Sequence, residues 1–166
     1  MNAREVIELL ELAPLPVEGG WFRQIWRSPA DAAVPDGTAI VALLTDEPEG
    51  FSQFHRLGGD EIWHFYAGAP IELVLLEANG ASRRVALGSD LAADQRPVHV
   101  VRAGAWMAAR TTGAWSLMGN TMAPGFTSPT YEGGDVDELV AGWPAERDAI
   151  VELTRSDGSR RMPDGL

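Results

Sequence analysis

The sequence predicts an all-β domain, a sandwich or barrel with a short helix at its N-terminus and short helices near its C-terminus. From Gly19 onward, short apolar stretches alternate with turns rich in Gly, Pro, Asp and Asn, and this regular spacing is typical of sandwiches and barrels. Apolar residues recur at helical spacing only in residues 3–12 and 135–155. The length of 166 residues fits one domain, which we expect to span residues 1–155.

The elements follow from local signals taken in chain order. Residues 3–12 form the first helix, and Pro14 and Pro16 end its pattern. The predicted strands cover residues 38–45, 61–66, 71–78, 82–88, 97–103, 106–110 and 115–123. The turns between them have the sequences LGGD, AGAP, EANGAS and RTTGA.

Two short helices are predicted in residues 135–155. Asp135 or Asp137 would lie near the N-cap of the first helix, and Pro144 would open the second. Residues 156–166, SDGSRRMPDGL, are polar and lie at the end of the chain, so we expect a flexible tail outside the domain.

Composition excludes several kinds of chemistry and partner. The chain has no cysteine, and all 13 basic residues are arginine, so thiol nucleophiles, Cys-ligated metals and lysine Schiff bases are excluded. The formal net charge of −11 argues against nucleic acid and anionic membranes as partners. Because no apolar run has the length of a membrane span and the N-terminus lacks a signal-peptide pattern, we expect a cytoplasmic protein without membrane contact.

Two of the three histidines lie in residues 51–68, FSQFHRLGGDEIWHFYAG. If the segments on either side of the Gly-Gly turn pair as a hairpin, strand alternation places His55 and Glu61 on one side. His64 and Tyr66 would then point to the other side, at the mouth of a pocket or in a contact between sheets or subunits. A carboxylate beside an imidazole raises the pKa of the histidine and orients its ring, as a general base requires.

This stretch resembles the first motif of the cupin superfamily, in which Gly, His, Glu and Gly recur at set intervals. The matching positions are Gly50, His55, Glu61 and Gly68. RAGAWM, residues 102–107, is similar to the second motif around Gly104. With PVEGGWFRQIWRS (16–28), residues 54–76 and APGF (123–126), the likeness extends over about residues 6–153 and is specific for the cupin-5 or DUF985-like, RmlC-like subfamily. It implies a double-stranded β-helix, the cupin jelly-roll barrel, with a small-molecule pocket, and a homodimer.

The resemblance also bears on metals. A typical cupin metal site has three histidines and one glutamate, whereas this chain keeps His55 and Glu61 and has Leu57 and Met107 at the other two positions. A thioether is a poor ligand for Mn, Fe(II) or Zn. We therefore expect no cofactor, with at most a weakly held divalent metal on His55 and Glu61. His99, in a strand, has the pattern of a structural residue.

Three functions are consistent with these residues. The first is metal-independent isomerase or epimerase chemistry on a sugar-like or carbonyl-containing molecule, since the chain resembles sugar 3,5-epimerases in which a carboxylate-supported His removes a proton and a Tyr returns one. Tyr66 and Tyr131 are the two tyrosines available for that role. The second is a metal-dependent dioxygenase or isomerase with a degenerate site. The third is a non-catalytic protein that binds a small ligand.

The expected ligand-binding residues are taken from the same stretches. They are Arg23, Phe51, Gln53, Trp63, Phe65, Met107 and Tyr131, with His55 and Glu61 as the catalytic pair. Arg23 would bind a phosphate or carboxylate, although a salt bridge at a sheet edge is an equal alternative. The aromatic residues would stack on a flat ligand or fill the barrel core. Trp21, Phe22 and Trp26 are candidates for the dimer interface.

Overall fold

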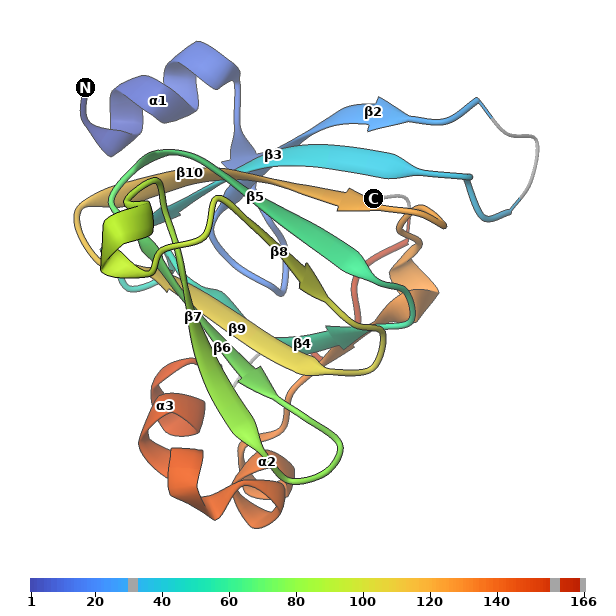
Figure 1. Cartoon of the computed structure of the whole chain (residues 1–166). Helices are drawn as coiled ribbons and strands as arrows, with labels where there is room; N and C mark the ends of the chain where they lie inside the picture. The colour runs from blue at the N-terminus through green and yellow to red at the C-terminus, as the bar shows by residue number, and fades with distance from the viewer. Residues whose placement is uncertain (30–32, 156–158, 165–166) are drawn as a thin grey trace.

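A computed structural model describes residues 1–29, 33–155 and 159–164 of the chain (Figure 1). Its helices and strands are α1 (Ala3–Leu10), β1 (Ala13–Pro14), β2 (Trp21–Arg27), β3 (Thr38–Thr45), β4 (Ser52–Leu57), β5 (Glu61–Gly68), β6 (Ile71–Leu76), β7 (Ser82–Leu87), η1 (Leu91–Ala93), β8 (Val98–Val101), β9 (Trp106–Thr111), β10 (Trp115–Met122), η2 (Ser128–Thr130), β11 (Tyr131–Gly133), α2 (Val136–Gly142), η3 (Pro144–Glu146) and α3 (Arg147–Glu152). None of the helices in these described ranges is long and apolar enough to cross a membrane.

The strands form two antiparallel sheets that face each other. One sheet has six strands in the order β1-β2-β3-β10-β5-β8, and the other has five in the order β11-β4-β9-β6-β7. The predicted all-β jelly-roll barrel with short terminal helices is confirmed. Each predicted strand is present with ends that differ by only a few residues, and Asp135 caps α2 by accepting a hydrogen bond from the Glu138 backbone amide.

The predicted hairpin around Gly58 and Gly59 was wrong. β4 pairs with β9 and β11, whereas β5 pairs with β10 and β8, so the turn carries the chain from one sheet to the other. The Gly-Gly signal marks where a strand ends, but it does not say which strand becomes the neighbour. In a jelly roll, successive strands often lie in opposite sheets.

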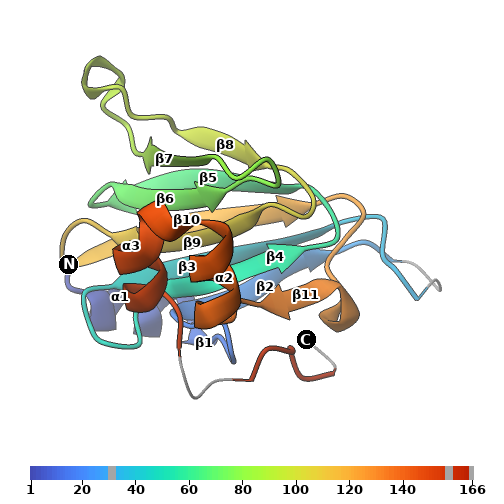
Figure 2. The same cartoon turned by 90° about the horizontal axis from the view of Figure 1, so that it is seen from below.

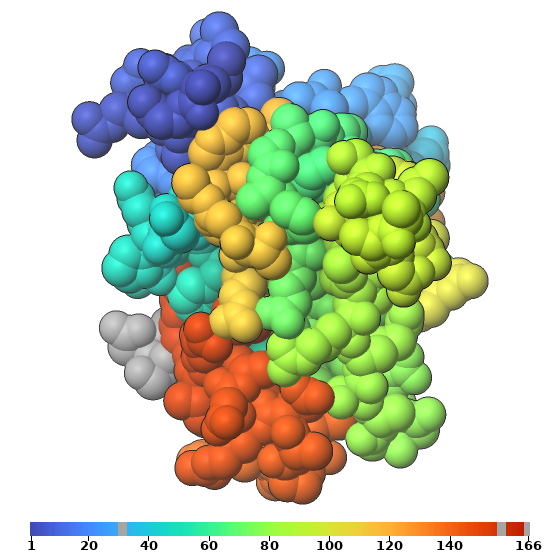
Figure 3. All heavy atoms as spheres, turned by 60° about the vertical axis from the view of Figure 1, so that its left-hand side comes forward, coloured from blue at the N-terminus to red at the C-terminus, as the bar shows by residue number. Residues whose placement is uncertain are grey.

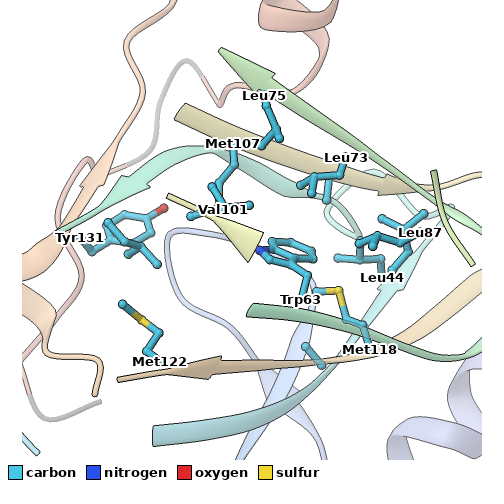
Figure 4. Packing of buried hydrophobic residues seen from close by; sticks show 14 of the residues in the cluster. Leu44, Trp63, Leu73, Leu75, Leu87, Val101, Met107, Met118, Met122 and Tyr131 are labelled. Carbon is cyan, nitrogen blue, oxygen red and sulfur yellow. The ribbon is translucent and has the colours of Figure 1, made fainter. Parts of the chain in front are cut away.

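The main core lies between the two sheets. Trp63 from β5, Met107 from β9 and Tyr131 from β11 pack there, and Figure 4 shows their side chains directed into the barrel. A second cluster, which includes Phe54 and Ile150, lies between the five-stranded sheet and the C-terminal helices (Figure 2). α1 packs on the outer side of the six-stranded sheet through Val6. In Figure 3, α1 and the C-terminal helices lie on opposite sides of the molecule.

The predicted C-terminal tail differs from expectation. Residues 156–158 and 165–166 of it lie outside the described residues, whereas residues 159–164, here called the C-terminal strap, pack against the barrel. The Gly133 backbone amide donates to the Arg160 carbonyl at 2.8 Å, and the Ser128 hydroxyl donates to the Pro163 carbonyl at 2.8 Å. Met162 is buried in the main core. The buried Met162 side chain and these hydrogen bonds together hold this polar segment on the barrel.

Candidate functional site

The loop before β2 places a carboxylate inside the barrel. In this loop Val17, Gly19 and Gly20 have positive φ angles of 64°, 99° and 68°. A Cβ atom at Gly19 would collide with the Phe51 carbonyl oxygen and the Arg155 guanidinium, so only glycine fits there. A positive φ at a β-branched residue such as Val17 is strained. Glu18 sits between these residues, and the tight turn directs its side chain inward.

Hydrogen bonds from β4 hold this loop in place. The Ser52 hydroxyl donates to Glu18 Oε1 at 2.8 Å. The Gln53 amide side chain donates to the Val17 carbonyl at 2.8 Å, and the Gln53 backbone amide donates to the Glu18 carbonyl at 2.9 Å. Gln53, predicted to bind ligand, therefore fixes the loop that carries Glu18.

A β-bulge in β4 decides which of its side chains face the interior. Ser52 pairs with Ala109 and His55 pairs with Met107, so β4 has one residue more than β9 over this interval. The extra residue lets both Ser52 and His55 face the barrel. Strict strand alternation would place Phe51 on the same face as His55. Phe51, expected to bind ligand, instead packs in the cluster under the C-terminal helices, away from the candidate site.

His55 is buried and has a defined orientation. Its Nδ1 lies 2.8 Å from the Gln53 carbonyl oxygen, and since a carbonyl only accepts, Nδ1 carries the hydrogen. Nε2 lies 3.9 Å from Glu18 Oε2, and the ring stacks on Tyr131 with a centroid separation of 5.1 Å. The carboxylate beside His55 is therefore Glu18. Its predicted partner Glu61 comes from the opposite sheet, so the expected pairing across a hairpin was wrong.

Glu61 is a buried carboxyl with an altered pKa. The Trp63 indole donates from Nε1 to Glu61 Oε2 at 2.7 Å. Burial raises the pKa of Glu61 to about 8, and the negative charge of Glu18 acts in the same direction, while Trp63 and Asn120 oppose the shift. Asn120 lies close enough to affect the carboxyl, yet its Nδ2 forms no hydrogen bond of good geometry with a described residue. At neutral pH, Glu61 is therefore mainly protonated.

Glu18 and Glu61 meet at one cavity, here called the carboxylate cavity. It has a volume of about 60 Å³, several times the ~10–15 Å³ that one water molecule needs. Asn120, Gln24 and Thr38 add polar groups to the wall. The apolar part of the lining consists of Leu15, Phe22, Ile40, Met122, Phe126 and Met162. Two acidic groups thus face a small, mostly apolar space, which is suited to acid–base chemistry on a small molecule.

Tyr131 lies behind this cavity, against His55. Its hydroxyl is buried without a hydrogen-bond partner of good geometry among the described residues. Burial, with the nearby negative charge of Glu18, raises the pKa of Tyr131 far above its ordinary value, so the phenol keeps its proton. Trp63, Phe65 and Met107 are core residues of the barrel, and of the three only Trp63 contacts a cavity carboxyl.

The remaining predicted site residues lie on the outside of the barrel. Arg23 forms an exposed salt bridge with Glu11 at 2.8 Å, which is the alternative that the sequence left open. His64 stacks on Tyr66, and the His64 Nε2 lies 3.3 Å from the Thr121 hydroxyl. Both are on the outer face of β5, as strand alternation predicts, and neither lines the carboxylate cavity. His99, by contrast, lies opposite the buried Trp63 and so faces the inner side of the sheet, and its partial burial lowers its pKa.

Sequence reasoning missed Glu18, Asn120 and Met162. A signal for Glu18 was present, since an acidic residue directly precedes two glycines in the stretch PVEGGWFRQIWRS. Asn120 lies in a strand with no polar pattern around it. Met162 belongs to a polar segment that gave no reason to expect a place in the wall of the cavity.

The donor set does not fit a tightly held metal ion. Within residues 1–29, 33–155 and 159–164, no three His, Asp or Glu side chains are grouped as metal ligands would be. Leu57 and Met107, at two of the positions where the resemblance implies histidine, are buried in the core. Weak binding of a divalent ion by His55 and Glu61 stays a prediction.

Comparisons with known proteins identify relatives. The Cupin_5 family model, described as cupin superfamily (DUF985), matches residues 4–133. Protein SO0799 from Shewanella oneidensis has a similar structure, with a TM-score of 0.86 and 33% identity over 95% of this chain and 99% of that one. A hypothetical protein from Leishmania major has a TM-score of 0.81 and 25% identity over 93% of this chain and 99% of its own.

More distant structures share only the fold. Oxalate decarboxylase from Bacillus subtilis has a TM-score of 0.59 and 9% identity, over 95% of this chain and 40% of that one. No curated protein matches the chain.

Proposed function

For this chain, which belongs to the Cupin_5 family of the cupin superfamily (DUF985), we propose a proton-transfer function. The chain binds a small carbonyl-containing or sugar-like molecule in the carboxylate cavity and transfers protons on it. The proposal rests on one observation: Glu18 and Glu61 line the same cavity, and the pKa of Glu61 is raised to about 8. Two acidic groups whose environments differ are the usual arrangement for acid and base roles.

The two carboxyl groups have complementary tasks. Protonated Glu61 donates its proton to the carbonyl oxygen of the ligand. Negatively charged Glu18 accepts the proton from the adjacent carbon, and the electrons of that C–H bond form the C=C bond of an enol. Return of a proton to carbon regenerates a carbonyl compound, either isomerised or with inverted configuration. The chemistry is therefore that of an isomerase or epimerase.

His55 and Ser52 are positioning residues in this proposal. Ser52 orients Glu18 through the hydroxyl hydrogen bond, and His55 lies beside the other oxygen of the same carboxyl at 3.9 Å. With the hydrogen on Nδ1, the lone pair of His55 lies on Nε2, the ring nitrogen nearer to Glu18. Tyr131, stacked on His55, shields His55 and Glu18 from water. Its hydroxyl is the candidate group for returning a proton to the carbon.

Proton exchange in D₂O tests the proposal. The substrates are cyclohexanone and dihydroxyacetone, and ¹H NMR follows the loss of the signals of protons next to the carbonyl. The wild-type protein is expected to accelerate exchange, and Glu61→Gln and Glu18→Gln to reduce the rate at least about 100-fold. Glu11→Gln, which changes an exposed carboxylate on the outer surface, is the matched control and should leave the rate unchanged.

Exchange at the rate of a protein-free blank, or an undiminished rate in Glu61→Gln, would contradict the proposal. Binding of these molecules without exchange would instead favour a non-catalytic ligand-binding protein. The apolar lining of the cavity is the observation that supports this second candidate.

We also propose a homodimer formed through the outer face of β5 and β8. Tyr66, Val98 and Val100 are exposed there, and the pairing of His64 with Val98 places these strands side by side. Trp26 and Ile25 on β2 extend the exposed apolar surface on the same sheet. Phe22, a candidate for the interface from the sequence, lines the carboxylate cavity and has no part in this face. Exposed apolar side chains gathered on one face, as on β5 and β8, are typical of an interface.

A further inference from the structure

We infer that the carboxylate cavity takes an uncharged ligand, with a compact apolar body and a single oxygen-bearing end, and that Met162 of the C-terminal strap limits its size. This inference rests on the proposed function, since it concerns the same cavity. It excludes molecules that carry a phosphate or a carboxylate, which the expected role of Arg23 had left open.

The charges around the cavity disfavour a negatively charged ligand. None of its described lining residues is an arginine or a histidine, and the chain has no lysine. Arg23 points outward and pairs with Glu11. An anion placed here would meet the charge of Glu18 with no arginine, lysine or histidine in the described lining to offset it, and burial would increase the cost of that repulsion.

Arg155, on the loop side of the cavity, uses both terminal nitrogens of its guanidinium in other contacts. The Arg155 guanidinium donates to the Val17 carbonyl at 3.3 Å and to the Glu49 carbonyl at 3.0 Å, and it forms a salt bridge with the Glu49 carboxylate at 2.8 Å. It also lies over the Phe51 ring at 5.2 Å. Arg155 thus supports the loop that carries Glu18 and is committed to that position.

One hydrogen-bond donor in the polar part of the cavity wall has no partner in the described part of the chain. Asn120 is only 6% exposed and lines the cavity, and its Nδ2 has no hydrogen-bond partner of good geometry among the described residues. Protonated Glu61 provides a second donor beside it. A carbonyl or hydroxyl oxygen accepts from both groups, and a hydroxyl also donates to Glu18. An ammonium ion carries donors only, so it would leave Asn120 Nδ2 without an acceptor.

The apolar end is closed by the strap. Met162 meets Phe126, Phe22 and Met122 around the cavity. The strap is fixed by the backbone and Ser128 hydrogen bonds described above, and the Arg160 side chain also donates from Nε to the Gly133 carbonyl at 3.0 Å. Met162 lies outside residues 4–133, the part that the family model matches. The size limit on this side is therefore set by the chain's own C-terminal segment.

Three ligands with the same six-membered ring test the charge preference: cyclohexanone, cyclohexylamine and cyclohexanecarboxylate. The chain has five methionines, so ¹³C-methyl labelling gives a small set of signals, of which Met122 and Met162 report on the cavity. At pH 7, cyclohexanone is expected to shift both signals saturably, with an affinity at least tenfold above that of the amine or the carboxylate.

The size limit is tested with 4-tert-butylcyclohexanone. Met162→Ala is expected to bind it at least fivefold more tightly than wild type, and the volume-conserving Met162→Leu is expected to bind it like wild type. Met162→Ala can also lower the stability of the protein. The three-ligand comparison uses the wild-type protein alone, so it tests the charge preference independently of this variant.

Equal or tighter binding of the carboxylate or the amine would overturn the inference, as would the absence of any cyclohexanone shift. An unchanged affinity in Met162→Ala would overturn the role of the strap. These outcomes can be told apart from failure of the proposed function. Proton exchange together with tighter binding of charged ligands would overturn only the inference. Binding of cyclohexanone without proton exchange would overturn only the proposed chemistry.

Discussion

The Ser52 hydroxyl donates a 2.8 Å hydrogen bond to Glu18 Oε1 and thereby joins a loop carboxyl to the five-stranded sheet. Ser52 faces the barrel because β4 contains a bulge, and Glu18 faces it because the loop has successive positive φ angles. Two local irregularities of the backbone therefore meet in one contact. Irregular backbone conformations of this kind are concentrated at functional sites.

Ser52→Ala should destabilise the protein by roughly 1.5–3 kcal/mol, because it removes a buried hydrogen bond to a charged group. Ser82→Ala is the matched control, since Ser82 donates to Glu146 at the same distance of 2.8 Å but on the surface. Its effect should stay within about 0.5 kcal/mol. Urea unfolding at pH 7 measures both variants, and equal effects would argue against a special role for the Ser52 contact.

Gly19→Ala should be more harmful than Gly80→Ala, although both glycines have positive φ angles, 99° and 83°. Gly80 has no atom within 4 Å of an added Cβ, so its substitution costs only the backbone preference of about 1–2 kcal/mol. At Gly19 the added atom also meets the Phe51 carbonyl and Arg155. For Gly19→Ala we therefore expect the unfolding free energy to fall by at least about 2 kcal/mol more than for Gly80→Ala, and cyclohexanone binding to weaken. Similar stabilities of the two variants would contradict the tight loop.

The sequence was sufficient to predict seven of the strands in the described residues because their signals are local. Alternating or continuous apolar runs bounded by Gly and Pro located strands such as β3 and β10 almost to the residue. Strand partners are not local: β4 and β5 flank one turn, yet they lie in different sheets. The bulge in β4 also reversed the face of Phe51, because one extra residue changes the alternation for all those before it.

The candidate site was predictable only in part for the same reason. Glu61 was singled out by its motif and lines the cavity, while His55 reaches it through Glu18. The position of Glu18 depends on a loop fold that follows from Gly19 and from contacts with residues more than 30 positions away. Met162 enters the wall through tertiary packing, for which a single methionine in a polar segment gives no pattern.

Stability should fall between about pH 5 and pH 8 as a result of Glu61. Its pKa is raised from 4.5 to about 8 in the folded protein, so in this range the folded state holds a proton that the unfolded chain has released. The contribution is complete below pH 4.5 and is lost as pH rises through 8, with a size of a few kcal/mol. The groups facing Glu61 are Glu18, Trp63, Asn120 and Tyr131.

Glu61→Gln removes this titration without changing the shape of the side chain. The unfolding free energies of wild type and the variant are measured in urea from pH 5 to pH 8. The wild-type value minus the variant value should decrease as the pH rises. The contributions of carboxylates that titrate alike in both proteins cancel in this difference. A flat difference would mean that Glu61 keeps an ordinary pKa.

Val98→Asp should dissociate the proposed homodimer, since Val98 is 47% exposed at the centre of the outer face of β5 and β8. Leu91→Asp, at a site that is 66% exposed in η1, is the control for adding an acid to an exposed apolar position. Light scattering after size-exclusion chromatography should give a dimer for wild type and Leu91→Asp and a monomer for Val98→Asp. A monomeric wild type would remove this face as an interface.

The most direct test of the account is the titration of the Glu61 side-chain carboxyl by ¹³C NMR, with the signal assigned by its loss in Glu61→Gln. The account predicts a midpoint near pH 8, which should move to lower pH in Glu18→Gln because the neighbouring negative charge is removed. A midpoint near 4.5, or one that Glu18→Gln leaves in place, would contradict it.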